Sequence, residues 1–366
     1  MPDFLSDELT ALHDRVAALA QGPLAALRDD AALAPTDRNA QVRALAKQAG
    51  LFGLTQDAAT PALTLLVARE TLARHGVGHL HGLFGPDAGL LAGVAEPLRT
   101  THLLPMLAGE RRGGFAFTEP SDAPRPTWAA VDGDHLVVTG RKSYVTGGAE
   151  ADFLVALVEV DGQGPAMVVI DTTLPGVAID RHFSSLDGST HAAFCFDAVC
   201  VPRSHAMGAP GAGRSQALAR ISAVRRLVAA DALGTALWAV DFVGADLQRD
   251  RRGGPRAQSE RLRQRYGAMR IQAYAARAAV YRAARLHDSG QDAVNESIAA
   301  KVIATETAGQ LVDQAIQLVG GEALVTGHPL EAALRRLRAL RLAEGETDVL
   351  QVNLARGFLD LGKGRL

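Results

Sequence analysis

The chain has 366 residues, a formal net charge of −2 and a hydrophobic share of 48%. This length suffices for two or three domains with a large core, and the hydrophobic share is globular rather than disordered. The near-neutral charge predicts no general attraction to nucleic acid or membrane. No apolar run approaches the length that a membrane-spanning helix needs, so no membrane association is expected.

The first part of the chain, residues 1–112, is expected to form a helical domain. Residues 7–30 and 37–54 carry apolar residues three and four positions apart, and a third such stretch is broken by Gly76 and Gly78. The N-terminal sequence MPDFLSDELTALHDRVAALA lacks a basic region followed by an uninterrupted apolar run. It predicts an amphipathic helix and not a signal peptide.

Residues 113–208 are expected to form a β domain of the sandwich or barrel type. Short β-branched and aromatic runs, such as HLVVTGRKSYVTGG and DFLVALVEV, alternate with turn sequences such as DGD and LDGST. Cys195 and Cys200 lie in one apolar stretch without C-x-x-C spacing. They are expected to be buried free thiols in a reducing cytoplasm, and the arginine- and alanine-rich composition suggests a bacterial one.

Residues 209–366 are expected to form an antiparallel bundle of four or five helices. Long periodic stretches follow one another there, several of them ended by glycine. The predicted fold is therefore mainly α with a central β domain: an N-terminal helical domain, a β domain and a C-terminal helical bundle.

This order of segments and its motifs resemble the acyl-CoA dehydrogenase family over most of the chain. The motifs are Thr-Glu-Pro at 118–120, the exit strand F-x-x-V-x-V-P at 196–202, Gln-x-x-Gly-Gly at 317–321 and Glu-Gly at 344–345. The resemblance implies an FAD enzyme that oxidises the Cα–Cβ bond of an acyl thioester such as acyl-CoA. It also implies an electron-transfer flavoprotein as electron acceptor, and it implies no metal.

Glu344 stands where the resemblance places the catalytic base. In one branch of the family, the carboxylate that removes the α proton precedes a glycine, as Glu344 precedes Gly345. Other branches place the base just before a family arginine on an earlier helix, but Val224 precedes Arg225 here. A carboxylate must be desolvated to act as a base near neutral pH. Spacing alone fits equally a surface glutamate before a glycine that caps a helix.

Arg225 matches the family arginine near the substrate carbonyl and the base. Arg226 beside it is then expected to be an exposed partner. The alternative is that both are ordinary surface arginines of a helix.

The resemblance assigns four residues to the flavin ring. Thr118 and Thr146 match family threonines that hydrogen-bond the ring system, and a hydroxyl can donate or accept there. Tyr144 stands where many members carry a tryptophan against the isoalloxazine, and Phe115 takes another aromatic position near the ring. Without the resemblance to the family, all four would be interpreted as ordinary strand residues of a β domain.

Gln317, Gly320 and Gly321 match the segment that in the family reaches the ADP part of FAD, bound mainly by the neighbouring subunit. Glycine lets a backbone approach phosphate closely. The same glycines would also serve as a helix C-cap. The resemblance therefore implies a homodimer or homotetramer.

Several phosphate contacts of the family are altered. The usual Gly-x-Gly-Ser-Asp loop is shortened, so that Ser121 and Asp122 align with its Ser-Asp and Ser121 is the candidate contact. The family arginine that reaches FAD across the dimer matches Arg251 or, alternatively, Arg252. Glu346 and Asp348 replace polar cofactor contacts, although carboxylates repel a pyrophosphate unless they face ribose hydroxyls. FAD is therefore expected to bind through unusual contacts.

Two alternatives remain at this point. The chain could be a catalytically degenerate or partner-dependent member that works as a subunit of a hetero-oligomer. A nucleic-acid-binding relative is the less favoured one, suggested by the arginines between positions 249 and 270. Such a run is more often a solvated helix face or a contact between subunits.

Overall fold

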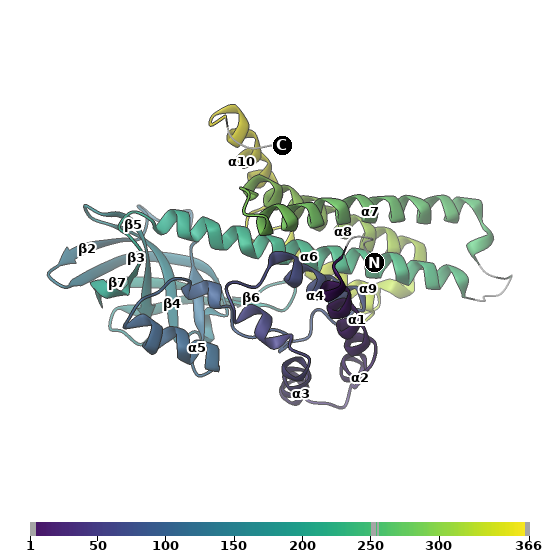
Figure 1. The fold of residues 1–366 in the computed structure, drawn as a ribbon, viewed down its shortest axis with the longest axis horizontal. Helices are drawn as coiled ribbons and strands as arrows, with labels where there is room; N and C mark the ends of the chain where they lie inside the picture. The colour runs from purple at the N-terminus through teal and green to yellow at the C-terminus, as the bar shows by residue number, and fades with distance from the viewer. Residues whose placement is uncertain (1–4, 250–253, 255, 363–366) are drawn as a thin grey trace. The chain divides into compact units, whose positions relative to one another are not determined.

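The fold is that of a computed structural model, which describes residues 5–249, 254 and 256–362. Helices come first, strands run from Gly113 to Met207, and helices return from Gly213, which confirms the predicted fold class (Figure 1). By internal contacts the chain divides into two compact units. The helical unit comprises Met1–Leu54, Ala59–Phe84 and Ser222–Leu366, and the sheet unit comprises Thr55–Ala58 and Gly85–Ile221.

The N-terminal helices of the helical unit begin and end where the local sequence dictates. The Ser6 hydroxyl accepts a hydrogen bond from the backbone N–H of Leu9 at 3.3 Å and so caps the first helix. The fourth helix ends just before Gly76, whose φ of 72° favours glycine, so the predicted break is confirmed. The helices are α1 (Asp7–Gln21), α2 (Pro23–Asp29), α3 (Pro35–Gln48) and α4 (Ala62–Arg74).

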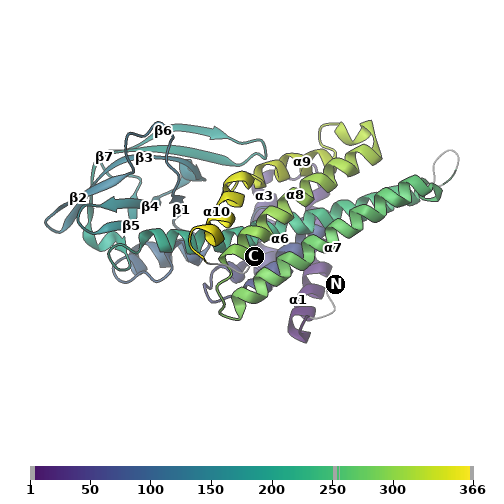
Figure 2. The same ribbon diagram turned by 90° about the horizontal axis from the view of Figure 1, so that it is seen from above.

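The C-terminal part of the described chain contains five α-helices, as the sequence predicts. Figures 1 and 2 show α7 and α8 running alongside the helical unit's part of α6. The helices are α6 (Gly213–Gln248), α7 (Glu260–Asp288), α8 (Val294–Val319), α9 (Pro329–Leu340) and α10 (Thr347–Leu359).

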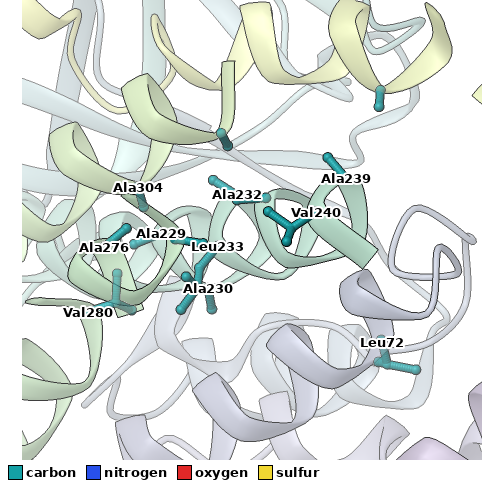
Figure 3. Packing of buried hydrophobic residues seen from close by; sticks show 14 of the residues in the cluster. Leu72, Ala229, Ala230, Ala232, Leu233, Ala239, Val240, Ala276, Val280 and Ala304 are labelled. Carbon is teal, nitrogen blue, oxygen red and sulfur yellow. The ribbon is translucent and has the colours of Figure 1, made fainter. Parts of the chain in front are cut away.

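The core of the helical unit is built largely from alanine and other small residues. Figure 3 shows Ala229, Ala232 and Leu233 of α6 packed in this core with residues of α7 and α8. Small side chains let helix axes approach closely. Gly234 marks one such close approach, since a Cβ atom there would lie 2.5 Å from the carbonyl oxygen of Glu70 on α4.

Helix α6 is long and apolar enough to cross a membrane by length and composition, because its most apolar 18-residue window has a mean hydropathy of 1.5. On this measure the expectation that no apolar run approaches that length is wrong. In the structure, 56% of the window is buried inside the protein, as in the core helix of a bundle. The helix is therefore weak evidence for a membrane.

The described strands of the sheet unit form one hydrogen-bonded sheet in the order β6-β7-β3-β2-β4-β5-β8, with β1 paired parallel to β4. β4 is buried except at the half-buried Glu159, which explains why the rest of its sequence FLVALVEV is apolar. The strands are β1 (Gly113–Ala116), β2 (Trp128–Asp132), β3 (His135–Thr146), β4 (Phe153–Val160), β5 (Gly164–Asp171), β6 (Val177–Ser184), β7 (Thr190–Pro202) and β8 (Ala206–Met207).

The two cysteines of β7 are free, as predicted, but the prediction that both are buried is wrong. Cys195 is half-buried and Cys200 is exposed. Successive side chains of a strand point to opposite faces. Phe194 and Phe196 take the core-facing positions, so Cys195 between them faces away from the core.

Candidate functional site

Glu344 lies in the connection between α9 and α10 and not at a helix end. Helix α9 ends at Leu340, and Arg341 is its C-cap, so the interpretation of Gly345 as a helix cap is wrong. Glu344 has a φ of 56° and Gly345 a φ of 107°. The left-handed region is costly for a residue with a side chain, by about 1–3 kcal/mol, and such strain clusters at functional sites.

The surroundings of position 345 leave no room for a side chain, so glycine is required there. A Cβ atom at this position would lie 2.9 Å from Cδ2 of Leu350, a buried residue of α10. The glycine therefore serves two purposes: it adopts the positive φ, and it lets Leu350 pack beneath the turn that carries Glu344.

The structure brings Arg225 next to Glu344. The Arg225 side chain is buried, and its Nε donates to the backbone carbonyl oxygen of Glu344 at 2.9 Å. Burial lowers the pKa of the Arg225 guanidinium, while the Glu344 carboxylate acts to raise it. The interpretation of Arg225 as a surface arginine is therefore wrong, and the carboxylate has a cation in its electrostatic neighbourhood.

The prediction that Arg226 is exposed is wrong as well. It is half-buried, and its Nη1 donates to the hydroxyl oxygen of Ser297 on α8 at 3.3 Å. Burial lowers the pKa of its guanidinium, against the effect of Asp288. The neighbouring arginines of α6 thus have different partners.

Lys301 on α8 is a residue of this site that the sequence reasoning missed. Its side chain is fully buried, and its Nζ donates to the carbonyl oxygens of Arg341 at 3.0 Å and Gly345 at 2.7 Å. Burial lowers the pKa of its ammonium to about 8. A signal was present, because Ser297, Lys301 and Thr305 lie four residues apart on a buried helix face.

A second polar network holds both ends of the turn. The Thr347 hydroxyl donates to Oε1 of Glu306 at 2.6 Å, and Nε of Arg341 donates to the same oxygen at 2.8 Å. Burial acts to raise the pKa of Glu306, but these two partners outweigh it and the pKa is lowered. The turn between Arg341 and Thr347 is thus attached at both ends to the same carboxylate of α8.

In the sheet unit, the segments carrying Thr118 and Tyr144 lie side by side. The backbone N–H of Ser143 donates to the carbonyl oxygen of Thr118 at 2.8 Å. The side chains of Thr118, Tyr144 and Thr146 are all exposed, and Tyr144 is 65% exposed with a φ of 55°. Residues far apart in the sequence therefore present exposed hydroxyls and an aromatic ring in the sheet unit.

A buried ion pair joins these two segments, and the sequence reasoning missed it. Lys142 is 1% exposed, and its Nζ donates to Oε1 of Glu119 at 2.7 Å. The same oxygen accepts from the backbone N–H of Thr127 at 2.8 Å. Burial lowers the pKa of Lys142, while Glu119 acts to raise it.

An aromatic cluster surrounds Tyr144. Its ring meets that of Phe183 edge-on with centroids 5.4 Å apart, and Phe183 stacks on His191 at 5.5 Å. Nδ1 of His191 lies 3.3 Å from the hydroxyl oxygen of Thr146. Phe183 and His191 were missed because they come near Thr146 only through strand pairing: β7 pairs with β3, which places His191 opposite Thr146, and with β6, which places Phe183 opposite His191.

Phe115 lies on β1, half-buried against the core of the sheet unit. It stacks on Phe117 with ring centroids 6.0 Å apart, and the Arg220 guanidinium lies 5.4 Å from its centroid. The Phe115 ring therefore packs against Phe117 and Arg220 within the sheet unit.

The segment expected to reach the ADP part of the cofactor follows α8. Gln317 is exposed in the last turn of the helix, and Gly320, with a φ of 99°, caps it through a bond from its N–H to the carbonyl oxygen of Ile316 at 2.9 Å. A Cβ atom on Gly320 or Gly321 would meet no atom within 4 Å. The C-cap interpretation is therefore confirmed, and the backbone beside it is open to an approaching group.

The other candidate phosphate contacts are dispersed. Ser121 is exposed, and the neighbouring Asp122 is paired with Arg141 of β3 at 3.1 Å. Glu346 precedes α10 and Asp348 lies in its first turn, both exposed. Arg251, the candidate for the contact across the dimer, lies outside the described residues, as does the neighbouring Arg252.

The donor set of these residues fits a flavin dinucleotide. Hydroxyls at Thr118 and Thr146 suit the polar edge of an isoalloxazine, and the exposed ring of Tyr144 suits its face. The open backbone at Gly320 and Gly321 suits a pyrophosphate.

Comparison with known proteins identifies the family by sequence, and solved structures share the fold. Residues 211–359 match the family model described as acyl-CoA dehydrogenase, C-terminal domain. A 3-(aryl)acrylate reductase of Clostridium sporogenes (strain ATCC 15579) is 31% identical over 281 residues, which cover 74% of each chain. An acyl-CoA dehydrogenase of Bacillus subtilis (strain 168) is 31% identical over 305 residues, which cover 80% of each chain.

The solved glutaryl-CoA dehydrogenase of Mycobacterium smegmatis has the same fold. It is 21% identical, with a TM-score of 0.82, and the match covers 99% of this chain and 97% of that one. The chain therefore belongs to the acyl-CoA dehydrogenase family, a family of FAD-dependent oxidoreductases acting on CH–CH donors.

Proposed function

We propose that this protein catalyses α,β-dehydrogenation of an acyl-CoA, with FAD as its cofactor and Glu344 as the general base. The observation that carries the proposal is the strained turn at Glu344: the residue has a left-handed φ of 56°, and buried cations on two helices donate to the carbonyl oxygens of Glu344 and Gly345. Strain of this kind at a matching motif position is expected of a residue selected for chemistry.

In the proposed reaction, the Glu344 carboxylate removes a proton from the α carbon of the thioester. FAD, when bound, supplies the acceptor for the hydride that leaves the β carbon. Glu344 is half-buried, so its carboxylate is partly shielded from water. Arg225 holds the backbone beside it and places positive charge near the site.

We propose acyl-CoA as the substrate class because several relatives are named for it. One is the acryloyl-CoA reductase (NADH) of Anaerotignum propionicum, 30% identical over 301 residues. That name and the 3-(aryl)acrylate reductase describe reduction, so the direction of the reaction in this protein is part of the test. In the dehydrogenating direction, the two electrons removed require an acceptor, for which we propose an electron-transfer flavoprotein.

We also propose a homodimer or homotetramer. Helix α10 has 13 residues, of which Leu350 alone is buried in the described chain. Val349, Val352, Phe358 and Leu359 on this helix are exposed. A short helix with one buried residue is marginal by itself, so packing against a second copy would stabilise it.

For location we propose a bacterial cytoplasm, to which two free cysteines are suited.

The arginine-rich stretch supports the enzyme over a nucleic-acid-binding relative. Arg256 donates to the carbonyl oxygen of Leu318 at 2.7 Å and to Asp246 at 3.3 Å. Nε of Arg263 donates to the carbonyl oxygen of Ala257 at 2.6 Å. These described arginines are thus engaged within the chain.

The test is flavin bleaching in the FAD-loaded protein under anaerobic conditions. A panel of saturated acyl-CoAs is added to wild type, to Glu344→Gln and to Glu260→Gln, a control at an exposed glutamate of α7. A panel of enoyl-CoAs added to the reduced protein tests the opposite direction. We expect Glu344→Gln to slow the chemical step by about 10²–10⁴-fold while FAD stays bound, because a general base contributes that much.

Equal bleaching rates in wild type and Glu344→Gln would reject Glu344 as the base. A protein that stays colourless with added FAD would instead favour the degenerate or partner-dependent alternative. In that case, copurification should find a second subunit that carries the complete motifs.

A further inference from the structure

Lys301 is fully buried on α8, and its hydrogen bonds go to backbone carbonyls of one turn. A lysine is rarely fully buried unless it is paired, because removing an ammonium from water is costly. A methionine or leucine would fill the same space without that cost. A charge at this position therefore needs an explanation beyond packing.

The two carbonyls that Lys301 binds lie on either side of the Glu344 residue. Arg341 O precedes it by three residues and lies 3.0 Å from Nζ, and Gly345 O follows it directly at 2.7 Å. The carbonyl oxygen of Glu344 itself accepts from Nε of Arg225 on α6. Buried cations from two helices thus hold two successive carbonyls of the turn, which fixes the peptide plane on the C-terminal side of Glu344.

We propose that Lys301 is a positioning residue for the reaction: its ammonium maintains the left-handed turn at Glu344 and so directs the carboxylate toward the substrate. Loss of the ammonium leaves both carbonyls without their charged donor and lets the turn relax toward an ordinary φ. This inference rests on the proposed role of Glu344, and nothing in it requires Lys301 to touch substrate.

The charges around Lys301 make its effect depend on pH. Burial and the nearby guanidinium groups of Arg225 and Arg341 lower the pKa of the ammonium, the carboxylates of Glu344 and Glu306 act to raise it, and the net result is a pKa of about 8. Lys301 is therefore protonated at neutral pH and becomes neutral above about pH 8. A neutral amine is a weaker donor to both carbonyls, so the rate should fall as pH rises through this range.

The first experiment compares the pH dependence of kcat in wild type, Lys301→Met, Lys301→Gln and Lys47→Met. Lys47 is an exposed lysine of α3 and serves as the matched control. We expect a basic limb near pH 8 in wild type and in the control. Lys301→Met should lower kcat at pH 7 by about 10- to 100-fold, as misplacement of a reacting group does, and should lose that limb. Lys301→Gln keeps an uncharged amide donor, so its kcat at pH 7 should lie between those of wild type and Lys301→Met.

The second experiment needs neither substrate nor catalysis. Hydrogen exchange at pH 7, read by mass spectrometry over residues 341–350, should be faster in Lys301→Met than in wild type and unchanged in Lys47→Met. If Glu344→Gln remains active, the proposed base is wrong, yet exchange still decides whether Lys301 holds the turn.

If Glu344→Gln is inactive while Lys301→Met keeps wild-type kcat and wild-type exchange, the positioning role is overturned. A wild-type profile that stays flat to pH 9.5 also overturns it, and that outcome does not depend on any variant folding.

Discussion

The guanidinium of Arg225 binds the backbone of Glu344, with Nε 2.9 Å from its carbonyl oxygen. The arginine therefore holds the backbone at the point where the chain turns. Since Glu344 carries a φ of 56°, a donor at this carbonyl stabilises a conformation that the residue would not adopt by itself.

Replacement of Arg225 by glutamine should impair catalysis more than it impairs folding. The shorter amide loses the bond to Glu344, so we expect kcat to fall by about 10- to 100-fold. The free energy of unfolding should fall by about 1–3 kcal/mol, because a buried hydrogen bond is lost. Arg226→Gln is the control, since Arg226 binds Ser297 and not the turn. Steady-state kinetics and urea unfolding of both variants give the comparison, and equal kcat values in the two would contradict it.

Gly345→Ala should destabilise the protein and disturb the turn. The new Cβ would lie 2.9 Å from Cδ2 of Leu350, at a φ of 107° that alanine rarely adopts. We expect the free energy of unfolding to fall by about 1–3 kcal/mol. Gly53→Ala is the matched control, because a Cβ there meets no atom within 4 Å and its φ is not positive. Thermal unfolding of the two variants measures the difference, and a Gly345→Ala protein as stable as the control would show that the turn tolerates a side chain.

Tyr144→Ala should weaken FAD binding. Loss of an exposed ring that packs on a cofactor face removes about 0.5–1.5 kcal/mol, so the Kd should rise about 2- to 10-fold. Tyr274→Ala on α7 is the control, as Tyr274 is 78% exposed and lies in the helical unit. Titration of cofactor-free protein with FAD, followed by flavin fluorescence, gives both constants. An unchanged Kd in Tyr144→Ala would remove this residue from the binding surface.

Asp171→Asn should destabilise the protein at neutral pH but not in acid. His102 and Arg111 bind the Asp171 carboxylate, and they lower its pKa to about 2 even though burial acts to raise it. Because the folded pKa lies below the ordinary value, the ionised carboxylate stabilises the fold above about pH 4. That contribution is lost as pH falls toward 2.

We expect Asp171→Asn to lower the free energy of unfolding by about 2 kcal/mol at pH 7, from a depression of nearly two pKa units. The difference from wild type should shrink between pH 4 and pH 2.5. Urea unfolding at several pH values measures it, with Asp161→Asn at an exposed turn as control. A difference that stays constant over this range would mean that the carboxylate charge is not the cause.

The local pattern of the sequence was enough to predict the order of helices and strands. Apolar spacing and glycine positions depend only on neighbouring residues, so the helix end before Gly76 and the break around Gly345 were both visible. The motif at Glu344 and Arg225 was visible too, because a motif is also a matter of local spacing. Burial was less predictable: Cys200 proved exposed and Arg226 half-buried, since the face that a residue presents is set by what packs against its element.

The sequence by itself determined the family, the segment order and the glutamate that precedes a glycine. Only the tertiary structure showed that Lys301 reaches the carbonyl of Gly345, 44 residues along the chain, and that His191 lies beside Thr146, 45 residues away. It also showed that Glu344 is held in the left-handed region. The reason is physical: which helix faces meet and which strands pair depend on the packing of the whole unit. The four-residue spacing of Ser297, Lys301 and Thr305 marks a polar series on α8, but it does not say which distant carbonyls Lys301 binds.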